Sequence, residues 1–232
     1  MSKETNLKNK ADTNRLVSLR REYLEKVLAR DKREAVRLIV GTAEDGVPIS
    51  DLYIEVLQPV QREIGRLWQN NEITVAQEHY CTAVTQLVMS QLYSYVFSGE
   101  KNGHKMVMTC ISGELHEVGA RMVADFFEIS GWDTYFMGAN MPVESIVDAI
   151  IENDAELIGI SVTMNYGVPF AQELIGRIKS NVQVAKTKVL VGGRPFLLSD
   201  TLWRVTGADG FAIDAAAAVV QGEQLVSNGG VV

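Results

Sequence analysis

The sequence predicts two units of different fold class, a helical bundle followed by an α/β domain with a parallel sheet. Up to about residue 98, apolar residues recur at the three- and four-residue spacing of amphipathic helices. From residue 105 onward, short apolar runs alternate with helical stretches, which is typical of parallel strands covered by helices on both faces. The polar segment 99–104 separates the two patterns and is predicted to be a linker.

The first unit is predicted to be a four-helix bundle over residues 15–98, behind a polar, disordered tail over residues 1–14. Asp31 and Glu34 have the spacing of a capping box that opens the second helix. Pro59 is expected to kink the third helix, because proline lacks an N–H and its ring clashes with the preceding turn. The helices are expected over residues 15–29, 31–45, 50–69 and 74–96.

The second unit, residues 105–232, is predicted to be a flavodoxin-like (Rossmann-like) domain with five parallel strands. The strands are expected over 105–111, 133–137, 157–162, 187–192 and 209–212. The helices are expected over 117–130, 143–153, 168–181, 196–206 and 214–227, before a disordered end, SNGGVV. Such a sheet binds ligands at the carboxyl ends of its strands, so the functional residues should follow the strands.

The charge distribution and the cysteine count exclude some classes of protein. The formal charge is −7, but residues 1–37 carry +5 and the remaining 195 residues −12. The basic segment is either a solvated helix face or a surface for nucleic acid or an acidic partner. Only two cysteines, Cys81 and Cys110, are present, which excludes a disulfide scaffold and a Cys-rich zinc site. Without a signal peptide or a membrane-spanning run, we expect a soluble, cytoplasmic protein.

The loop after the first strand contains Glu114, His116 and Gly119. Glu114 can accept the proton of one imidazole nitrogen of His116, which leaves the other nitrogen to bind a metal. Gly119 would let the backbone approach a bulky ligand closely. The alternative is a surface histidine that caps a helix.

Two later strand ends also have polar or side-chain-free positions. The hydroxyls of Ser161 and Thr163 can bond a polar ligand edge or cap the next helix. Gly192 and Gly193 permit positive φ and form either an opening for a ligand or a tight turn. Neither a G-x-G-x-x-G motif nor a phosphate-binding Lys-Ser/Thr loop is present, so a nucleotide cofactor is weakly supported.

In the helical unit, Trp68 precedes the pair Glu78-His79 by nine intervening residues. Across a short hairpin, this aromatic side chain and the two polar ones can face one another as a flat lid. The alternative is a core tryptophan with a hydrogen-bonded histidine.

Taken together, these motifs resemble the signature of cobalamin-binding proteins. That family has Asp-x-His-x-x-Gly, then Ser-x-Leu, then Gly-Gly; this chain has Glu114-x-His116-x-x-Gly119, Ser161-x-Thr163 and Gly192-Gly193. The four helices resemble the cap of methionine-synthase-like corrinoid modules. The stretch LQPVQREIGRLWQNNEITVAQEH is similar to the cobalamin-dependent photoreceptor regulators. The resemblance covers about residues 15–228.

The resemblance implies roles for the loop residues. His116 would be the lower axial ligand of cobalt, in place of the cofactor's dimethylbenzimidazole, and Glu114 would orient it. Glu114 stands where the family has Asp, and Thr163 stands where it has Leu. The slot for the nucleotide tail would be lined by Gly119, Ser161, Thr163, Gly192 and Gly193.

The resemblance also implies that Trp68, Val75, Glu78 and His79 cover the upper face and enclose an adenosyl group. Adenosylcobalamin is therefore expected rather than methylcobalamin. Gln69 replaces a histidine that some of the photoreceptor regulators have after the tryptophan. Only about 14 residues precede the first helix, where those regulators have a winged-helix domain, so direct binding to nucleic acid is not expected.

The sequence thus predicts a cobalamin-binding sensory module, a light sensor that signals to a partner protein and is more a binding protein than an enzyme. The alternative is a corrinoid methyl carrier for a separate methyltransferase. A third hypothesis is a metal site without a corrinoid, formed by Glu78, His79, Glu114 and His116. A homo-oligomer is expected, as is common for cobalamin-binding modules.

Overall fold

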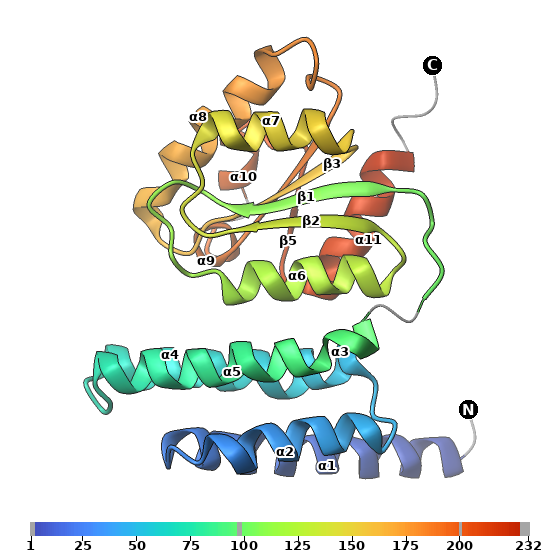
Figure 1. Ribbon diagram of the computed structural model, residues 1–232, viewed down its shortest axis with the longest axis vertical. Helices are drawn as coiled ribbons and strands as arrows, with labels where there is room; N and C mark the ends of the chain where they lie inside the picture. The colour runs from blue at the N-terminus through green and yellow to red at the C-terminus, as the bar shows by residue number, and fades with distance from the viewer. Residues whose placement is uncertain (1–2, 97–98, 200, 228–232) are drawn as a thin grey trace. The chain divides into compact units, whose positions relative to one another are not determined.

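The computed structural model describes residues 3–96, 99–199 and 201–227, with the side chains of α1 described from Asn14 onward. The chain divides into two compact units, Met1–Val96 and Phe97–Val232 (Figure 1). Most of the predicted disordered end, residues 228–232, lies outside the described residues. None of the helices in the described ranges combines the length and hydropathy needed to cross a bilayer.

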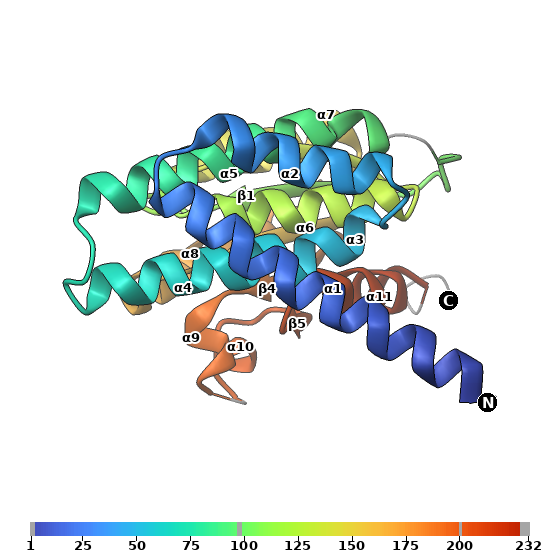
Figure 2. The same ribbon diagram turned by 90° about the horizontal axis from the view of Figure 1, so that it is seen from below.

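The first unit is helical throughout. Its elements are α1 (Lys3–Leu28), α2 (Lys32–Glu44), α3 (Ile49–Asp51), the π-helix η1 (Leu52–Leu57), α4 (Gln58–Gln69) and α5 (Val75–Val96). Helix α1 packs against α2 and η1, while α2 and α4 pack against α5 (Figure 2). The backbone of residues 3–14 is helical where a disordered tail was expected. This stretch contains neither Gly nor Pro, and its Lys, Glu, Leu and Ala residues favour helix.

One predicted local feature is present, and another region differs from its prediction. Asp31 is the N-cap of α2, and its side chain accepts a hydrogen bond from the N–H of Glu34 at 3.2 Å. Pro59 lies in the first turn of α4, directly after the π-helix. In that π-helix the N–H of Gln58 donates to the carbonyl of Tyr53, five residues earlier. The structure thus has a π-helical segment before Pro59, where the sequence predicted a kink at the proline itself.

The second unit is built on a five-stranded parallel sheet, as predicted. Its strands are β1 (Lys105–Cys110), β2 (Asp133–Gly138), β3 (Leu157–Ser161), β4 (Lys188–Gly192) and β5 (Gly210–Ala212), in the order β2-β1-β3-β4-β5. Helices α6 (Val118–Ile129) and α11 (Ala215–Ser227) cover one face, and α7 (Val143–Asn153) and α8 (Val168–Ser180) cover the other (Figure 1). This is the flavodoxin-like order.

The predicted helix over 196–206 is wrong as a continuous element. The structure has two short helices there, α9 (Arg194–Leu197) and α10 (Leu202–Val205). Ser199 and Thr201 lie between them, and the carbonyl of Ser199 accepts a hydrogen bond from the N–H of Leu202. This backbone bond spans three residues, as in a turn, in place of the four-residue bond of an α-helix, so the helix is interrupted although the apolar pattern continues.

The register of the sheet brings three strand ends side by side. Cys110 at the end of β1 is paired with Ser161 at the end of β3, and Ser161 is paired with Gly192 at the end of β4. The strand order reverses between β1 and β3, because β2 continues from one side of β1 and β3 from the other. The loops after β1 and β3 therefore begin at the switch point, where this fold places ligands.

Candidate functional site

A buried carboxylate joins the two loops at the switch point. The side chain of Glu114 is only 1 % exposed. Its Oε1 accepts hydrogen bonds from the Nδ1 of His116 at 2.5 Å and from the N–H of His116 at 3.1 Å. Its Oε2 accepts from the N–H of Thr163 at 2.8 Å and the N–H of Met164 at 3.2 Å. Glu114 thus binds its own loop with one oxygen and the loop after β3 with the other.

The hydrogen bonds keep Glu114 ionised despite its burial. Burial alone would raise its pKa, but the bonds from the His116 ring, the His116 N–H and the Thr163 N–H outweigh it and hold the pKa at about 2. An ionised carboxylate only accepts hydrogen bonds, so Nδ1 of His116 holds the shared proton. In the neutral ring, the lone pair that can bind a metal is then on Nε2. The His116 side chain is 53 % exposed, so the ring is accessible to a ligand.

The Cys110 thiol contacts the same loop. Its Sγ donates a weak hydrogen bond to the carbonyl of His116 at 3.7 Å. Burial, with the charges of Glu114 and Glu117, raises the pKa of Cys110 to about 12 against the lowering effect of a hydrogen bond with Ser161. Cys110 is therefore a protonated thiol at neutral pH, and the Ser161 side chain bonds inward to it.

The glycines near the strand ends differ in how much space a side chain would have. Gly193 has φ of +113°, and a Cβ there would lie 1.9 Å from the carbonyl oxygen of Val162. A Cβ on Gly192 would make only ordinary contact with the carbonyl oxygen of Ala212, at 3.6 Å. Gly193 is therefore required by a tight turn. Gly119, in the first turn of α6, is exposed and has open space where its Cβ would be.

Thr163 contributes to the link between the two loops through its backbone. The structure uses the backbone N–H of Thr163, with that of Met164, to bind Glu114. Sequence reasoning did not find Met164 or the link between the two loops. No side-chain pattern marks such a contact, because backbone N–H groups belong to almost every residue.

The first unit has a second pair of carboxylate and imidazole. The Nδ1 of His79 and the Oε2 of Glu78 are 2.5 Å apart, and the Thr82 hydroxyl donates to Glu78 Oε1 at 3.0 Å. The His79 side chain is 75 % exposed. Trp68, at the end of α4, is 41 % exposed, and Val75, at the start of α5, is 50 % exposed. Trp68 is therefore not a core residue of this unit.

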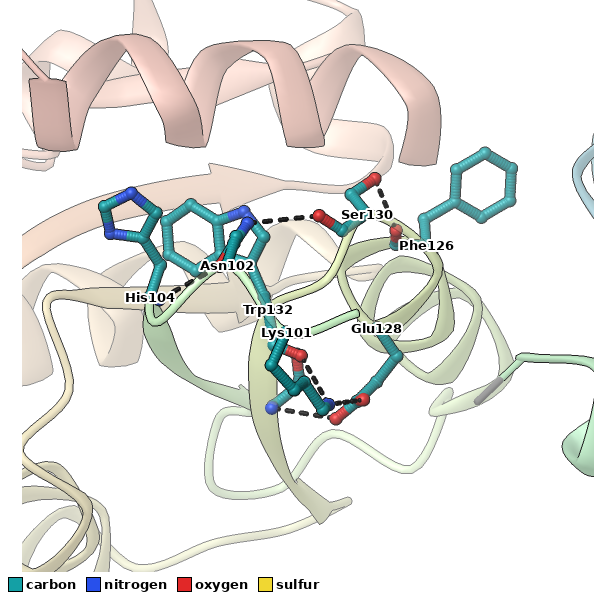
Figure 3. A network of polar contacts seen from close by, with 8 residues as sticks. Lys101, Asn102, His104, Phe126, Glu128, Ser130 and Trp132 are labelled. Atoms are coloured by element: carbon teal, nitrogen blue, oxygen red, sulfur yellow. Dashed lines mark hydrogen bonds and ion pairs between the residues drawn. The ribbon is translucent and has the colours of Figure 1, made fainter. Parts of the chain in front are cut away.

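The third histidine lies at the other end of the sheet. His104 directly precedes β1; its Nδ1 is 2.9 Å from Glu156 Oε2, and its ring packs on Trp132 at 4.9 Å between centroids. Figure 3 shows the surrounding network, in which Lys101 bonds to Glu128 and to the carbonyl of Trp132. These contacts attach the predicted linker to the end of α6 and the start of β2. His104 therefore takes part in the packing of this end of the domain.

Within the described residues, no three His, Cys, Asp or Glu side chains form a group that could hold a metal ion. The hypothesis of a site built from Glu78, His79, Glu114 and His116 without a corrinoid gains no support from this. A single imidazole held at Nδ1 by a carboxylate instead suits a metal ion whose other ligands come from a cofactor.

The chain matches two family models described as B12 binding domain. One matches residues 104–221, and the other matches residues 19–93. The first covers the sheet domain with Glu114, His116 and Gly193. The second covers most of the helical unit, with Trp68 and His79.

Similar proteins span both units. Dimethylamine corrinoid protein 3 of Methanosarcina acetivorans is 24 % identical over 197 residues, covering 84 % of this chain and 91 % of that protein. Dimethylamine corrinoid protein 2 of Methanosarcina mazei is 28 % identical over 198 residues, with the same coverage of 84 % and 91 %. The HTH-type transcriptional repressor CarH of Myxococcus xanthus is 25 % identical over 134 residues, 57 % of this chain and 44 % of that protein.

The fold comparison agrees. The structure of the Methanosarcina barkeri monomethylamine corrinoid protein matches with a TM-score of 0.79 and 20 % identity, covering 89 % of this chain and 98 % of that one. The order of motifs, the sheet topology and the two family models lead to one assignment. The chain belongs to the family of B12-binding domain proteins and binds cobalamin.

Proposed function

We propose that this protein is a corrinoid carrier that holds a methyl group for a separate methyltransferase. The observation that carries the proposal is the extent of the similarity to the dimethylamine corrinoid proteins, which covers 84 % of this chain and 91 % of the M. acetivorans protein. The similarity to CarH covers only 44 % of that repressor. The alternative that the sequence left open is thus better supported than the light sensor that it favoured.

In this proposal His116 is the lower axial ligand and Glu114 fixes its orientation. The proposal rests on the geometry described above: Glu114 holds Nδ1 of a half-exposed ring, and Nε2 would then be the nitrogen that binds cobalt. Cobalamin supplies a cobalt that can accept and give up a methyl group. Gly119 leaves open space beside the site for the cofactor. Ser161, Thr163, Gly192 and Gly193 remain our proposed residues for the nucleotide tail.

The light sensor stays as a second candidate because of one feature of the first unit. Trp68, Val75 and His79 are exposed around the turn between α4 and α5, and Glu78 holds the His79 ring. Apolar and aromatic side chains exposed next to a polar pair suit a flat lid over an adenosyl group. In that case adenosylcobalamin would be the bound form.

The two candidates are separated by loading the full-length protein in the dark with methylcobalamin or with adenosylcobalamin. A carrier should bind the methyl form at least as tightly and give its methyl group to a methyltransferase that uses corrinoid donors. Green light on the adenosyl form should leave its oligomeric state unchanged. Failure of methyl transfer, with a light-dependent change in oligomeric state, would exclude the carrier.

Variants of the lid residues sharpen this comparison. Trp68→Ala and His79→Ala should change the affinities for the two forms by similar factors if the protein is a carrier. A loss of about tenfold or more that affects only the adenosyl form would support the sensor. Tyr93→Ala is a matched control, because Tyr93 is also an exposed aromatic residue of the first unit, far along α5 from His79.

A further inference from the structure

Asn140 holds two consecutive residues of the loop that contains Glu114 and His116. Its side-chain Oδ1 accepts a hydrogen bond from the N–H of Gly113 at 2.8 Å. Its own backbone N–H donates to the carbonyl of Glu114 at 2.9 Å. Asn140 follows β2, which is the neighbour of β1 on the side away from β3. The loops after β1 and β2 are thus joined by a double contact at one residue.

The backbone conformation explains why the residue type matters. Asn140 has φ of +54°, in the left-handed region that Asn tolerates better than most residues. Gly113, which donates to it, has φ of +78°. A glycine at position 140 would accept the conformation but would have no side-chain acceptor for Gly113. Alanine would lose the acceptor and also be strained.

Glu114 is consequently held from both sides. The loop after β2 holds its carbonyl through Asn140, and the loop after β3 holds its carboxylate through Thr163 and Met164. The His116 ring is attached to the same carboxylate. The direction of the ring therefore depends on the position of the Glu114 backbone, which Asn140 fixes.

We propose that Asn140 is a positioning residue for His116, acting through Glu114. The inference rests on the proposed function, in which His116 is the cobalt ligand. When the contact with Gly113 is lost, the Glu114 backbone gains freedom. The carboxylate then holds Nδ1 of His116 less tightly, and the ring divides between its two tautomers and more orientations.

The test uses three variants of the full-length protein. Asn140→Gly removes the acceptor and keeps the left-handed conformation unstrained. Asn140→Asp keeps an oxygen in the place of Oδ1. Asp154→Gly is the matched control: Asp154 has φ of +50° and lies in the same unit, at the end of α7. Within the described part of the chain, the Asp154 side chain forms no hydrogen bond.

Two readouts are needed. The first is the tautomer of His116 in the cofactor-free protein, from the ¹⁵N shifts of its ring. The second is the affinity for cobalamin in the dark. We expect Asn140→Gly to reduce the Nδ1–H fraction and to weaken binding by about 3- to 10-fold, the size of one hydrogen bond. Asn140→Asp should restore both, and Asp154→Gly should change neither.

The proposal is overturned if Asn140→Gly and Asp154→Gly give the same tautomer ratio and the same affinity. It is also overturned if Asn140→Asp loses as much as Asn140→Gly, because the side-chain acceptor would then not be the cause. The tautomer readout does not require the cofactor. It therefore decides the role of Asn140 even if His116→Ala shows that His116 is not the cobalt ligand.

Discussion

The Glu114 carboxylate accepts a hydrogen bond from Nδ1 of His116 at 2.5 Å, with the carboxylate buried and the imidazole half exposed. A buried charge is costly unless it is hydrogen-bonded, and Glu114 has three further bonds from backbone N–H groups. The pair therefore combines a fixed, charged inner residue with an accessible outer one. A carboxylate that holds the second nitrogen of a histidine raises the basicity of the ligating nitrogen.

The first prediction concerns the pH dependence of stability. The pKa of Glu114 is about 2 in the folded protein against an ordinary value of 4.5, so its ionised form stabilises the fold above pH 4.5. That stabilisation is lost as the pH falls from 4.5 toward 2. Glu114→Gln should lower the free energy of unfolding of the cofactor-free protein by about 1–3 kcal/mol at pH 7. Chemical denaturation at several pH values measures it.

The difference between the native protein and Glu114→Gln should shrink as the pH falls through this range. The control is Glu173→Gln, because Glu173 is exposed on α8. A difference that is constant from pH 6 to pH 3 would show that folding does not lower the pKa of Glu114.

The second prediction concerns the turn after β4. Gly193→Ala would place a Cβ 1.9 Å from the Val162 carbonyl oxygen at φ of +113°, so the turn must move. We expect a loss of about 2–4 kcal/mol in the free energy of unfolding. Gly192→Ala is the neighbouring control, since its Cβ makes only ordinary contact. Equal losses in the two variants would contradict a special role for Gly193.

The third prediction separates cofactor binding from stability. Gly119→Ala adds a methyl group to α6 in open space, so the cofactor-free protein should be as stable as before or up to about 1 kcal/mol more stable. If cobalamin approaches the backbone there, its affinity should fall at least about tenfold. Gly176→Ala on α8 is the control, because it also has open space. It should leave the affinity unchanged, and a Gly119→Ala protein that does the same would exclude Gly119 from the cofactor slot.

The fourth prediction concerns the two thiols. Cys81 and Cys110 are both buried, and the pKa of Cys110 is raised to about 12. Because the thiolate is the reactive form, iodoacetamide at pH 8 should not modify Cys110 in the folded protein. Both thiols should react in denaturant, and peptide mass mapping identifies each. Rapid modification of Cys110 in the native protein would show that the loop above it opens.

Much of the second unit follows from its sequence, because its apolar strands alternate with helical stretches. The boundaries of all five strands lie within one residue of the predicted ranges. The Glu114–His116 contact was also predictable, since two residues of separation in a loop suffice for it. The break in the helix around Ser199 was not predictable, because the apolar pattern continues through the turn that separates α9 from α10.

The rest of the site depends on tertiary structure. Thr163 and Met164 bind Glu114 through backbone N–H groups, and Asn140 reaches Gly113 only because β2 lies beside β1. No spacing in the sequence indicates either contact, because the partners of each belong to different loops. The sequence gives the residue type of Asn140. Its contacts could be inferred only from the strand order and its left-handed backbone conformation.

The proposed role of His116 as the cobalt ligand can be tested on the cobalamin complex itself. The measurement is the dark absorption spectrum of the full-length protein and of His116→Ala, each loaded with adenosylcobalamin and desalted. We expect an imidazole-ligated spectrum for the native protein and its loss in His116→Ala. Identical spectra and equal binding in the two proteins would contradict this role.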